Sequence, residues 1–292
     1  MASKLDLAYK HCQRIAKKRA SNFYYAFLTL PLKKRKAIFA TYAFCRICDD
    51  IADGDLPNER KKTLLDDTRL LLSESRIGNV ANPVFTALSA TAINFNIPNQ
   101  YFVDIIDGVE MDLTWTQFHN FEELKTYCLR VASAVGLICI EVFGYCEPKA
   151  KEYAVDMGLA MQLTNIMRDI KEDVSRGRIY IPLDELTSFG YSTEEMTNGI
   201  YNDAFRKLMS FQAERARSYF ANGQHLIPML TPRSQACVAM LHQVYAKLLD
   251  RIEATCFNVF DERISLSQPE KLYMMTKLWM TSLSPFINQQ KK

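Results

Sequence analysis

The fold is decided by the stretch Tyr42-Ala-Phe-Cys-Arg-Ile-Cys-Asp-Asp-Ile-Ala-Asp53. In this stretch and before it, apolar residues recur at three- and four-residue steps, which predicts a helix over residues 32–53 with a broad buried face. Gly54 ends the pattern. Asp49 and Asp53 are four residues apart, so they stand on one helix face, about 6 Å apart along the axis. A buried helix that carries clustered acids needs a compensating cation.

The same periodicity predicts helices along nearly the whole chain. They cover residues 5–19, 59–73, 84–95, 100–113, 121–143, 149–173, 203–220, 232–250 and 268–281. Alternating strand patterns with Asn-Gly turns are nearly absent, so we expect an all-α fold of about ten to thirteen helices packed as one large bundle. The chain has no Gly/Ser-rich or Pro-rich linker and no internal repeat, so residues 1–292 are interpreted as a single domain.

The most apolar segment, residues 131–143, is predicted to lie deep in the bundle. Only Ser133 and Glu141 interrupt it with strong polarity. Its small residues, among them Gly136, would also let it line an elongated apolar cavity. Of these two interpretations, a filled core is favoured.

Composition restricts the partners of this chain. Lys and Arg number 36 against 33 Asp and Glu, and a net charge of +3 is too small to indicate a nucleic-acid surface. The N-terminus lacks an apolar core of signal-peptide length and no window of about 18 consecutive apolar residues exists, so a cytoplasmic protein is expected. The eight cysteines have no framework spacing and are expected to be reduced. Cys45-x-x-Cys48 lacks the second pair that a structural zinc site needs.

Two segments could touch a membrane surface. The basic run Lys33-Lys34-Arg35-Lys36 could meet phosphate or lipid, although a solvated helix start is favoured. The tail, residues 271–292, carries Leu272, Trp279 and several methionines before its Ser-Pro. Peripheral membrane contact through this tail is an alternative to a final helix that packs on the core, which is favoured.

The acidic cluster at Asp49 and Asp53 suits a hard divalent metal. No basic residue lies between the two carboxylates, and like charges at this spacing destabilise a helix by roughly a few tenths of a kcal/mol. Ligands that are all oxygen favour magnesium, manganese or calcium over zinc. A sparse set of carboxylates leaves coordination positions free, which suits magnesium shared with phosphate.

A second cluster has the same character. It lies in Gln162-Leu-Thr-Asn-Ile-Met-Arg-Asp-Ile-Lys-Glu-Asp173, where Asn165, Asp169 and Asp173 occupy positions i, i+4 and i+8. All three project from one helix face, which Gln162 joins. One acidic cluster alone is typical of a solvated helix surface. Two of them inside apolar helices indicate a shared site for metal and diphosphate.

Basic residues that could bind the oxygens of a diphosphate flank both clusters. Arg46 lies one turn before Asp49, and Arg176-Gly177-Arg178 follows the second cluster. An arginine fork binds phosphate with two hydrogen bonds. The glycine and the loss of helical pattern predict a mobile segment that closes over bound diphosphate. Within the second cluster, Arg168 and Glu172 are expected to pair with each other.

With these motifs the chain resembles the squalene and phytoene synthase family, the head-to-head branch of the trans-prenyltransferases. The resemblance runs through nearly the whole chain. Besides the two acidic motifs, its specific stretches are Ser21-Asn-Phe-Tyr-Tyr-Ala-Phe27, Asp107-Gly-Val-Glu-Met-Asp-Leu113, Tyr127-Cys-Leu-Arg-Val-Ala-Ser-Ala-Val-Gly136 and Gly177-Arg-Ile-Tyr-Ile-Pro182. It implies an isoprenoid-synthase-type bundle around a central apolar cavity and a transferase that acts on prenyl diphosphates.

The resemblance also implies roles for individual residues. Three magnesium ions would bridge the diphosphates to five ligands, namely Asp49, Asp53, Asn165, Asp169 and Asp173. The substrate-binding residues would be Phe23, Arg46, Gln162, Arg168, Tyr245 and Arg263, with the phenylalanine facing the carbocation and the prenyl chain. The catalytic set would be Asp49, Asp53, Asp169 and the hydroxyls of Tyr42 and Tyr127, which would line the reaction centre.

Within the family, residues 109–113 and 131–136 are most similar to bacterial presqualene diphosphate synthases of hopanoid pathways. Such an enzyme joins two farnesyl diphosphates and releases presqualene diphosphate. The alternatives are a phytoene synthase of a carotenoid pathway, which joins two geranylgeranyl diphosphates, and a squalene or dehydrosqualene synthase. NADPH is not expected to be required, although the missing dinucleotide fingerprint decides little because the squalene-forming members need none.

Two further interpretations belong to other classes. A helical assembly factor of the same fold that has lost the chemistry would carry degraded aspartates, whereas both motifs are intact. A terpene cyclase or head-to-tail prenyltransferase would share magnesium and helical packing. The stretch from Tyr127 to Gly136 disfavours that second interpretation.

Overall fold

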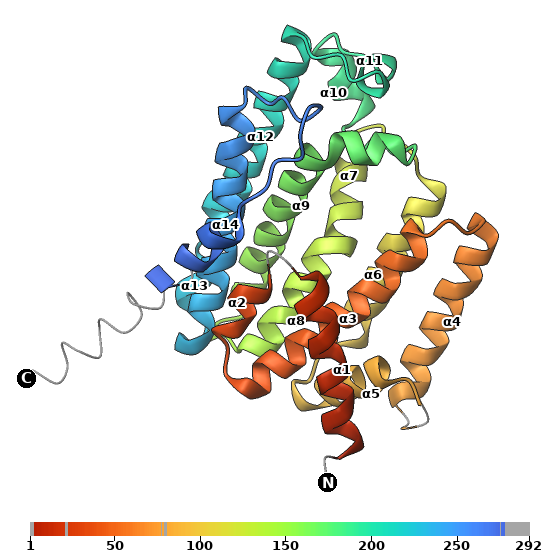
Figure 1. The fold of residues 1–292 in the computed structure, drawn as a ribbon, viewed down its shortest axis with the longest axis vertical. Helices are drawn as coiled ribbons and strands as arrows, with labels where there is room; N and C mark the ends of the chain where they lie inside the picture. Colours follow the sequence, from red (N-terminus) through yellow and green to blue (C-terminus); the bar gives the residue numbers. More distant parts are fainter. Residues whose placement is uncertain (1–2, 21–22, 77, 79–80, 275, 278–292) are drawn as a thin grey trace, which may run out of the picture.

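The computed structural model describes residues 3–20, 23–76, 78, 81–274 and 276–277, and Figure 1 shows them as a bundle of helices. The helices are α1 (Lys4–Arg19), α2 (Tyr24–Leu28), α3 (Leu32–Asp53), α4 (Asn58–Arg76), α5 (Pro83–Asn94), α6 (Asn99–Thr114), α7 (Phe121–Cys128), the π-helical η1 (Leu129–Ser133), α8 (Ala134–Phe143), α9 (Ala150–Ser175), α10 (Leu183–Ser188), α11 (Thr193–Thr197), α12 (Asp203–Gly223), α13 (Leu226–Met229) and α14 (Pro232–Ala254). The described residues contain no strand, only two isolated bridges. The all-α prediction is confirmed.

The long helices follow the predicted periodicity to within a few residues at each end. The short helices α2, α10, α11 and α13 were not predicted, because four to six residues are too few to show a helical repeat. Of the helix expected at residues 268–281, residues 268–274 and 276–277 are helical. Its remaining residues, and most of the tail suggested for membrane contact, lie outside the described part of the chain.

Local sequence explains where the helices begin and end. The side chain of Ser3 accepts a hydrogen bond from the backbone N–H of Asp6 at the start of α1, and Asn120 and Asn202 cap α7 and α12 in the same way. Pro31 precedes α3, and Gly54 follows its last residue. The acidic motif therefore occupies the C-terminal turn and a half of α3.

The predicted helix over residues 121–143 is not one regular helix. It consists of α7, one π-helical segment and α8, and α9 approaches the π segment η1 closely at Ser133. A Cβ atom on Gly158 of α9 would stand 2.8 Å from the Cα atom of Ser133, so only glycine permits this contact. The Ser133 hydroxyl donates to the carbonyl of Val155 across the same contact. Single π turns of this kind occur often at functional sites.

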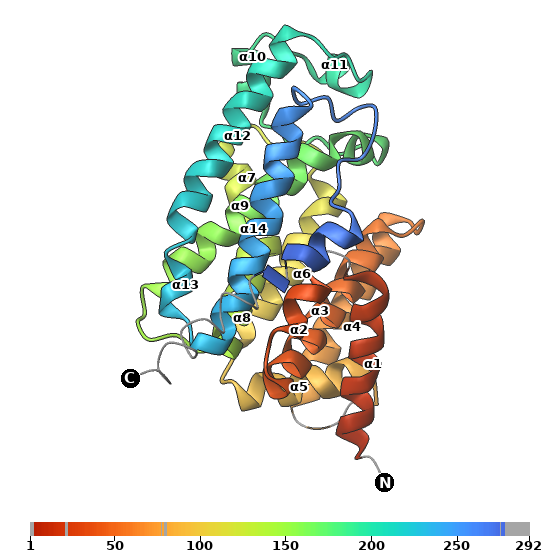
Figure 2. The same ribbon diagram turned by 60° about the vertical axis from the view of Figure 1, so that its left-hand side comes forward.

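Helix α9 runs through the middle of the bundle in Figures 1 and 2. It packs against α12 and α14 on one side and against α8 and η1 on the other. Helix α3 packs against α1, α5, α6 and α8. The helices that carry the two acidic motifs are thus both interior elements, and the motifs face each other near the ends of these helices.

A cavity of about 640 Å³ lies between α3, η1, α8, α9 and α14. Seven residues of the segment 131–143 line it, namely Val131, Ala132, Val135, Gly136, Cys139, Ile140 and Phe143. The favoured interpretation of this segment as a filled core is therefore wrong for one of its faces. The opposite face, with Ala134, Ile138 and Val142, is buried in the core. The cavity persists because the small residues on α8 and α9 leave space that no neighbour fills.

Within the described residues, Phe121–Phe143 is the one helical stretch long and apolar enough to cross a membrane by length and composition. In this structure it packs between α6 and α9 inside the bundle. Length and composition do not distinguish a core helix from a membrane span, so the stretch carries no further conclusion.

Candidate active site

Helix α3 presents the first acidic motif to a polar cavity of about 470 Å³ that Asp49 and Asp53 both line. Arg46, one turn earlier, holds Asp49 with a nitrogen–oxygen distance of 3.2 Å and Asp50 with one of 2.7 Å. Asp50 points outward to Arg19 of α1 and lines neither cavity. Asp49 and Asp53 therefore face the cavity and Asp50 faces away from it, as the i, i+4 spacing of the first two residues requires.

Helix α9 presents the second motif to the same polar cavity. Asn165, Asp169 and Asp173 all line it, together with Gln162. Arg168 binds Asp169 with both of its fork nitrogens, and Arg263 approaches the same carboxylate at 3.0 Å. The five residues expected to bind metal are thus brought together around one cavity.

The predicted pair of Arg168 and Glu172 is wrong. Arg168 lies inward, where its guanidinium reaches the adjacent Asp169, whereas Glu172 pairs with Arg176 at 2.9 Å. Burial decides the difference: the Arg168 side chain is only 11% exposed, and a buried guanidinium takes the nearest buried carboxylate. Helical spacing alone could not reveal that preference.

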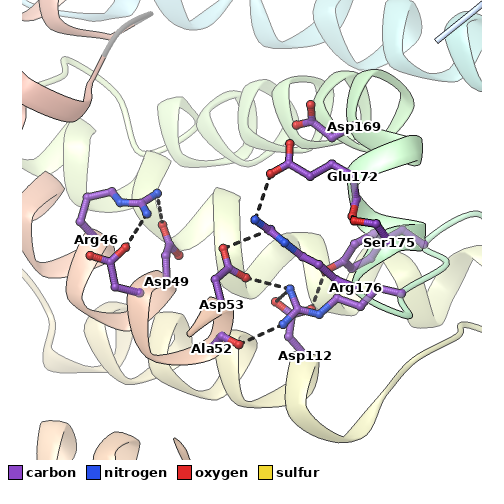
Figure 3. A network of polar contacts seen from close by, with 12 residues as sticks. Arg46, Asp49, Ala52, Asp53, Asp112, Asp169, Glu172, Ser175 and Arg176 are labelled. Atoms are coloured by element: carbon purple, nitrogen blue, oxygen red, sulfur yellow. Dashed lines mark hydrogen bonds and ion pairs between the residues drawn. The ribbon is translucent and has the colours of Figure 1, made fainter. Parts of the chain in front are cut away.

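The segment after α9 closes one side of the polar cavity. Figure 3 shows Arg176 between Glu172 of α9 and Asp53 of α3, and it contacts Asp53 at 3.2 Å. Arg178 is buried and binds Asp53 at 3.0 Å and the carbonyl of Ala52 at 3.3 Å. Arg176 thus links the two acidic helices, whereas Arg178 binds only the end of α3 and stands near Asp112 of α6; closure of this segment over bound diphosphate stays a prediction.

Sequence reasoning missed a cluster behind the first motif. Asp112 of α6 accepts a hydrogen bond from the Tyr180 hydroxyl at 2.7 Å and from the Tyr127 hydroxyl at 3.1 Å. The two phenol rings stack with centroids 5.1 Å apart, and Arg178 stands 4.0 Å from Asp112. The stretches that contain Asp112 and Tyr180 were part of the family resemblance, but nothing in them indicated that they would meet.

The aromatic residues expected around the substrates are divided between the two cavities. The Phe23 ring stands 5.9 Å from that of Tyr245 and 6.5 Å from that of Tyr42, and all three line the apolar cavity. Burial raises the pKa of Tyr42 to about 12, so its hydroxyl stays protonated at neutral pH. Tyr127 lines the polar cavity instead. The two tyrosines predicted to line the reaction centre thus line different cavities.

Seven residues line both cavities and mark their junction, namely Arg46, Asp49, Val131, Gln162, Asn165, Arg168 and Arg263. Arg19 of α1 and the buried Lys271 also line the apolar cavity. The sequence did not indicate either of these cations. A molecule with an anionic head and a long apolar tail fits this arrangement, with its head among the arginines and acids and its tail between α3, α8 and α14.

The electrostatics favour an added cation between α3 and α9. Burial, with Asp53 and Asp112 nearby, raises the pKa of Asp49 to about 7 despite the charge of Arg46. Burial and the charge of Asp169 raise the pKa of Asp173 to about 8. Burial opposes a low pKa for Asp169, but the hydrogen bonds from Arg168 hold it below its usual range. Arg168 therefore favours the charged form of Asp169, whereas burial and neighbouring carboxylates favour the protonated forms of Asp49 and Asp173.

The donor set fits a magnesium ion shared with diphosphate. The Asn165 Oδ1 atom is buried without a hydrogen-bond partner in this structure, so it has a free lone pair on the face that carries Asp169 and Asp173. No three His, Cys, Asp or Glu side chains among the described residues converge on a single ion. Magnesium accepts one or two carboxylates and completes its shell with water and phosphate oxygens, so an incomplete protein cage suits it.

The chain belongs to the squalene/phytoene synthase family, whose sequence model matches residues 16–270. Members of this family are prenyltransferases that use divalent metal to ionise a prenyl diphosphate, so the chain is a transferase of that class. Among curated proteins, it is 39% identical to the phytoene synthase of Mycobacterium tuberculosis, over 92% of this chain and 89% of the relative. It is 36% identical to the 15-cis-phytoene synthase of Synechocystis, over 94% of this chain and 86% of the relative.

Solved structures share the fold over almost the whole chain. A dehydrosqualene synthase in complex with a ligand superposes with a TM-score of 0.87 at 28% identity, covering 96% of this chain and 98% of the other. The squalene synthase HpnC from Alicyclobacillus acidocaldarius superposes with a TM-score of 0.81 at 26% identity, covering 88% and 97%. The predicted isoprenoid-synthase bundle is confirmed.

Removing divalent metal is expected to make stability depend on pH. Asp49 and Asp173 have folded pKa values of about 7 and 8, against 3.8 for an ordinary aspartate. Between those limits the folded protein binds more protons than the unfolded chain, so the free energy of unfolding falls as pH rises from about 5 to 8. Melting temperatures in EDTA should fall over this range, and magnesium should raise them most at the upper end.

The variant Asp173→Asn isolates this effect. It lacks one titrating group, so its melting temperature in EDTA should fall less between about pH 5 and 8 and should exceed that of the wild type at pH 8. Parallel melting curves for the two proteins across this range would contradict the prediction.

Proposed function

We propose that this chain joins two geranylgeranyl diphosphates head to head to form phytoene, with magnesium as the metal. The observation that carries the proposal is its similarity to phytoene synthases, at 39% and 36% identity over about nine-tenths of the chain. This proposal replaces presqualene diphosphate as the favoured product, because the short stretches that favoured it are outweighed by identity over the full chain.

The depth of the apolar cavity supports the longer substrate. Its lining follows η1 and α8 from Val131 to Phe143, a rise of about 18 Å at 1.5 Å per residue. An extended carbon chain advances roughly 1.2 Å per bond, so the 15 or so bonds of a geranylgeranyl chain span about 18 Å and those of a farnesyl chain about 13 Å. A twenty-carbon tail could therefore lie fully extended along α8, with its head at the junction of the cavities.

The proposed metal ligands are Asp49 and Asp53 on one side and Asn165, Asp169 and Asp173 on the other. By the family resemblance three magnesium ions would bind there together with the diphosphates. When bound, they neutralise the negative charge that develops as the carbon–oxygen bond of the diphosphate breaks. Arg46, Arg168 and Arg263 line both cavities, where their forks would bind the diphosphate oxygens through charge-assisted hydrogen bonds.

The allylic cation left by ionisation must be protected from water. The rings of Phe23, Tyr42 and Tyr245 lie close together in the wall of the apolar cavity, and aromatic faces attract a cation by roughly 0.5 to 2 kcal/mol. The cation would add to the double bond of the second substrate, and loss of a proton would give a cyclopropylcarbinyl diphosphate. A second ionisation, rearrangement and proton loss would give phytoene, which balances without NADPH.

A second candidate uses farnesyl diphosphate, with presqualene diphosphate, dehydrosqualene or squalene as the product. The dehydrosqualene synthase that superposes with a TM-score of 0.87 favours it, because its fold matches this chain over nearly all of both proteins. The two candidates share the metal ligands and arginines proposed above. They differ in how far the prenyl tail reaches along α8 and, for presqualene diphosphate and squalene, in how the second half of the reaction ends.

Incubation with magnesium and either substrate, with and without NADPH, distinguishes the candidates. We expect geranylgeranyl diphosphate to give phytoene at a kcat/KM at least about tenfold above that for farnesyl diphosphate, since the three- and four-unit tails differ by several buried methylenes. Mass spectrometry identifies the products, and NADPH should change neither product nor rate. A thirty-carbon product from farnesyl diphosphate alone would support the second candidate, and no product from either substrate would contradict both.

A further inference from the structure

The charge of this chain is strongly asymmetric. The first 36 residues contain ten Lys and Arg and a single acid, Asp6, for a net charge of +9. The other 256 residues contain 26 Lys and Arg against 32 Asp and Glu, for a net charge of −6. The overall charge of +3 conceals this separation. A charge asymmetry of this size indicates an anionic partner for the basic part.

Much of this charge lies in one stripe along the outside of α1. Leu7, Lys10, Arg14, Lys17 and Lys18 recur at three- and four-residue steps, and all five are exposed. None of the four cations forms an ion pair with a described residue. We call these five residues the basic face. In Figure 2, α1 forms the lower right edge of the molecule.

The fold does not need the basic face. The opposite side of α1, with Ala8, Cys12 and Ala16, is fully buried. It packs against α3 and α5 and holds the helix in place. Lys17 and Lys18 in the last turn complement the helix dipole, but like charges at this spacing repel each other, so helix stability does not account for the whole row.

Exposed apolar side chains stand at one end of the basic face. Lys36 of α3 pairs with Asp6 of α1 at 3.0 Å, and Lys33 lies over the ring of Phe95, so the starts of α1 and α3 and the end of α5 meet. Each of these three helix ends carries an exposed apolar side chain, namely Leu7 of α1, Leu32 of α3 and Ile93 of α5, which are 56%, 63% and 63% exposed. Cations beside exposed aliphatic side chains suit the headgroup and acyl boundary of a bilayer.

We propose that the basic face of α1, with Leu32 and Ile93, docks this protein on the surface of an anionic lipid bilayer. Lysines and arginines near such a surface are attracted by its negative potential, and aliphatic side chains gain by entering the acyl boundary. A nucleic acid would also attract the cations, but it offers no apolar layer for the three aliphatic side chains. The bilayer therefore accounts for both features.

The other end of α1 connects docking to the apolar cavity. Arg19, the last residue of α1, lines that cavity together with Lys271. A docked α1 would hold this part of the cavity wall close to the bilayer, where a hydrocarbon product partitions. This consequence rests on the proposed function, whereas docking itself requires only the charges and the aliphatic side chains.

The test compares two triple variants of equal charge. Lys10→Glu/Arg14→Glu/Lys17→Glu reverses the basic face, and Arg60→Glu/Lys207→Glu/Arg233→Glu reverses three exposed cations on α4, α12 and α14. Both change the net charge from +3 to −3. Partition onto vesicles of phosphatidylcholine with about one-third phosphatidylglycerol is measured by sedimentation. We expect the first variant to partition at least about 100-fold more weakly than the wild type, and the second within a few-fold of it.

Further measurements make the outcome specific. Wild-type binding should weaken with added salt and be absent on vesicles of phosphatidylcholine alone. Leu7→Ser/Leu32→Ser should weaken binding at unchanged net charge. Turnover of detergent-dispersed substrate should be the same in all variants. Equal turnover would show that the variants are folded, and this control does not depend on which product forms. Equal losses in both triple variants, unchanged binding in the first, or tighter binding to duplex DNA than to the vesicles would overturn the proposal.

Discussion

Asp49→Ala is expected to lower kcat by at least about 10³-fold, since even a single lost electrostatic contact to the developing charge costs about 10² to 10³. Asp49 lines both cavities at the end of α3 and would hold one of the metal ions. Without it, the charge that develops on the leaving diphosphate would be incompletely neutralised. The fold should survive, because Asp49 is repelled by Asp53 and Asp112 in the metal-free protein.

Asp50→Ala is the matched control for this prediction. Asp50 is the next residue on the same helix, but it points outward to Arg46 and Arg19 and lines neither cavity. Its replacement should change kcat by less than about fivefold, as expected for an exposed ion pair. Turnover at saturating magnesium and thermal melting would be measured for both variants. Near wild-type turnover in Asp49→Ala, or equal losses in the two variants, would show that the metal assignment is wrong.

Asp112→Asn is expected to lower kcat by about 10²-fold with little change in KM. Asp112 accepts hydrogen bonds from Tyr127 and Tyr180 and faces Arg178, so it fixes the hydroxyl of Tyr127 where the polar cavity begins. Asparagine keeps the shape of the side chain but loses the charge that orients both phenols. A residue that positions another group lowers kcat without weakening substrate binding.

The double variant Asp112→Asn/Tyr127→Phe tests whether Asp112 acts through Tyr127. If it does, the double variant should lose little more than Tyr127→Phe alone, because residues that act as a unit are not additive. Asp107→Asn is the control on the same helix, since Asp107 pairs with Arg69 and lines neither cavity. Additive losses in the double variant, or a large loss in Asp107→Asn, would contradict a positioning role.

Only part of the candidate site could be predicted from the sequence. Periodicity placed Asn165, Asp169 and Asp173 on one face of a helix, and in the structure all three line one cavity. By contrast, the choice of Arg168 between Asp169 and Glu172 depended on which side chains are buried. The cavity along η1 and α8 depended on how closely α9 approaches Ser133, and Gly158 alone does not disclose that distance.

The all-α class, the long helices and the two acidic faces could all be predicted from the sequence, because they follow from side-chain spacing within one helix. Its motifs also identified the family. Helix packing brings Asp112 and Tyr180 to Tyr127, brings Arg176 and Arg178 to Asp53, and leaves a cavity along α8. Each of these features depends on residues that are far apart in the chain. Such contacts arise from helix packing, which no local pattern encodes.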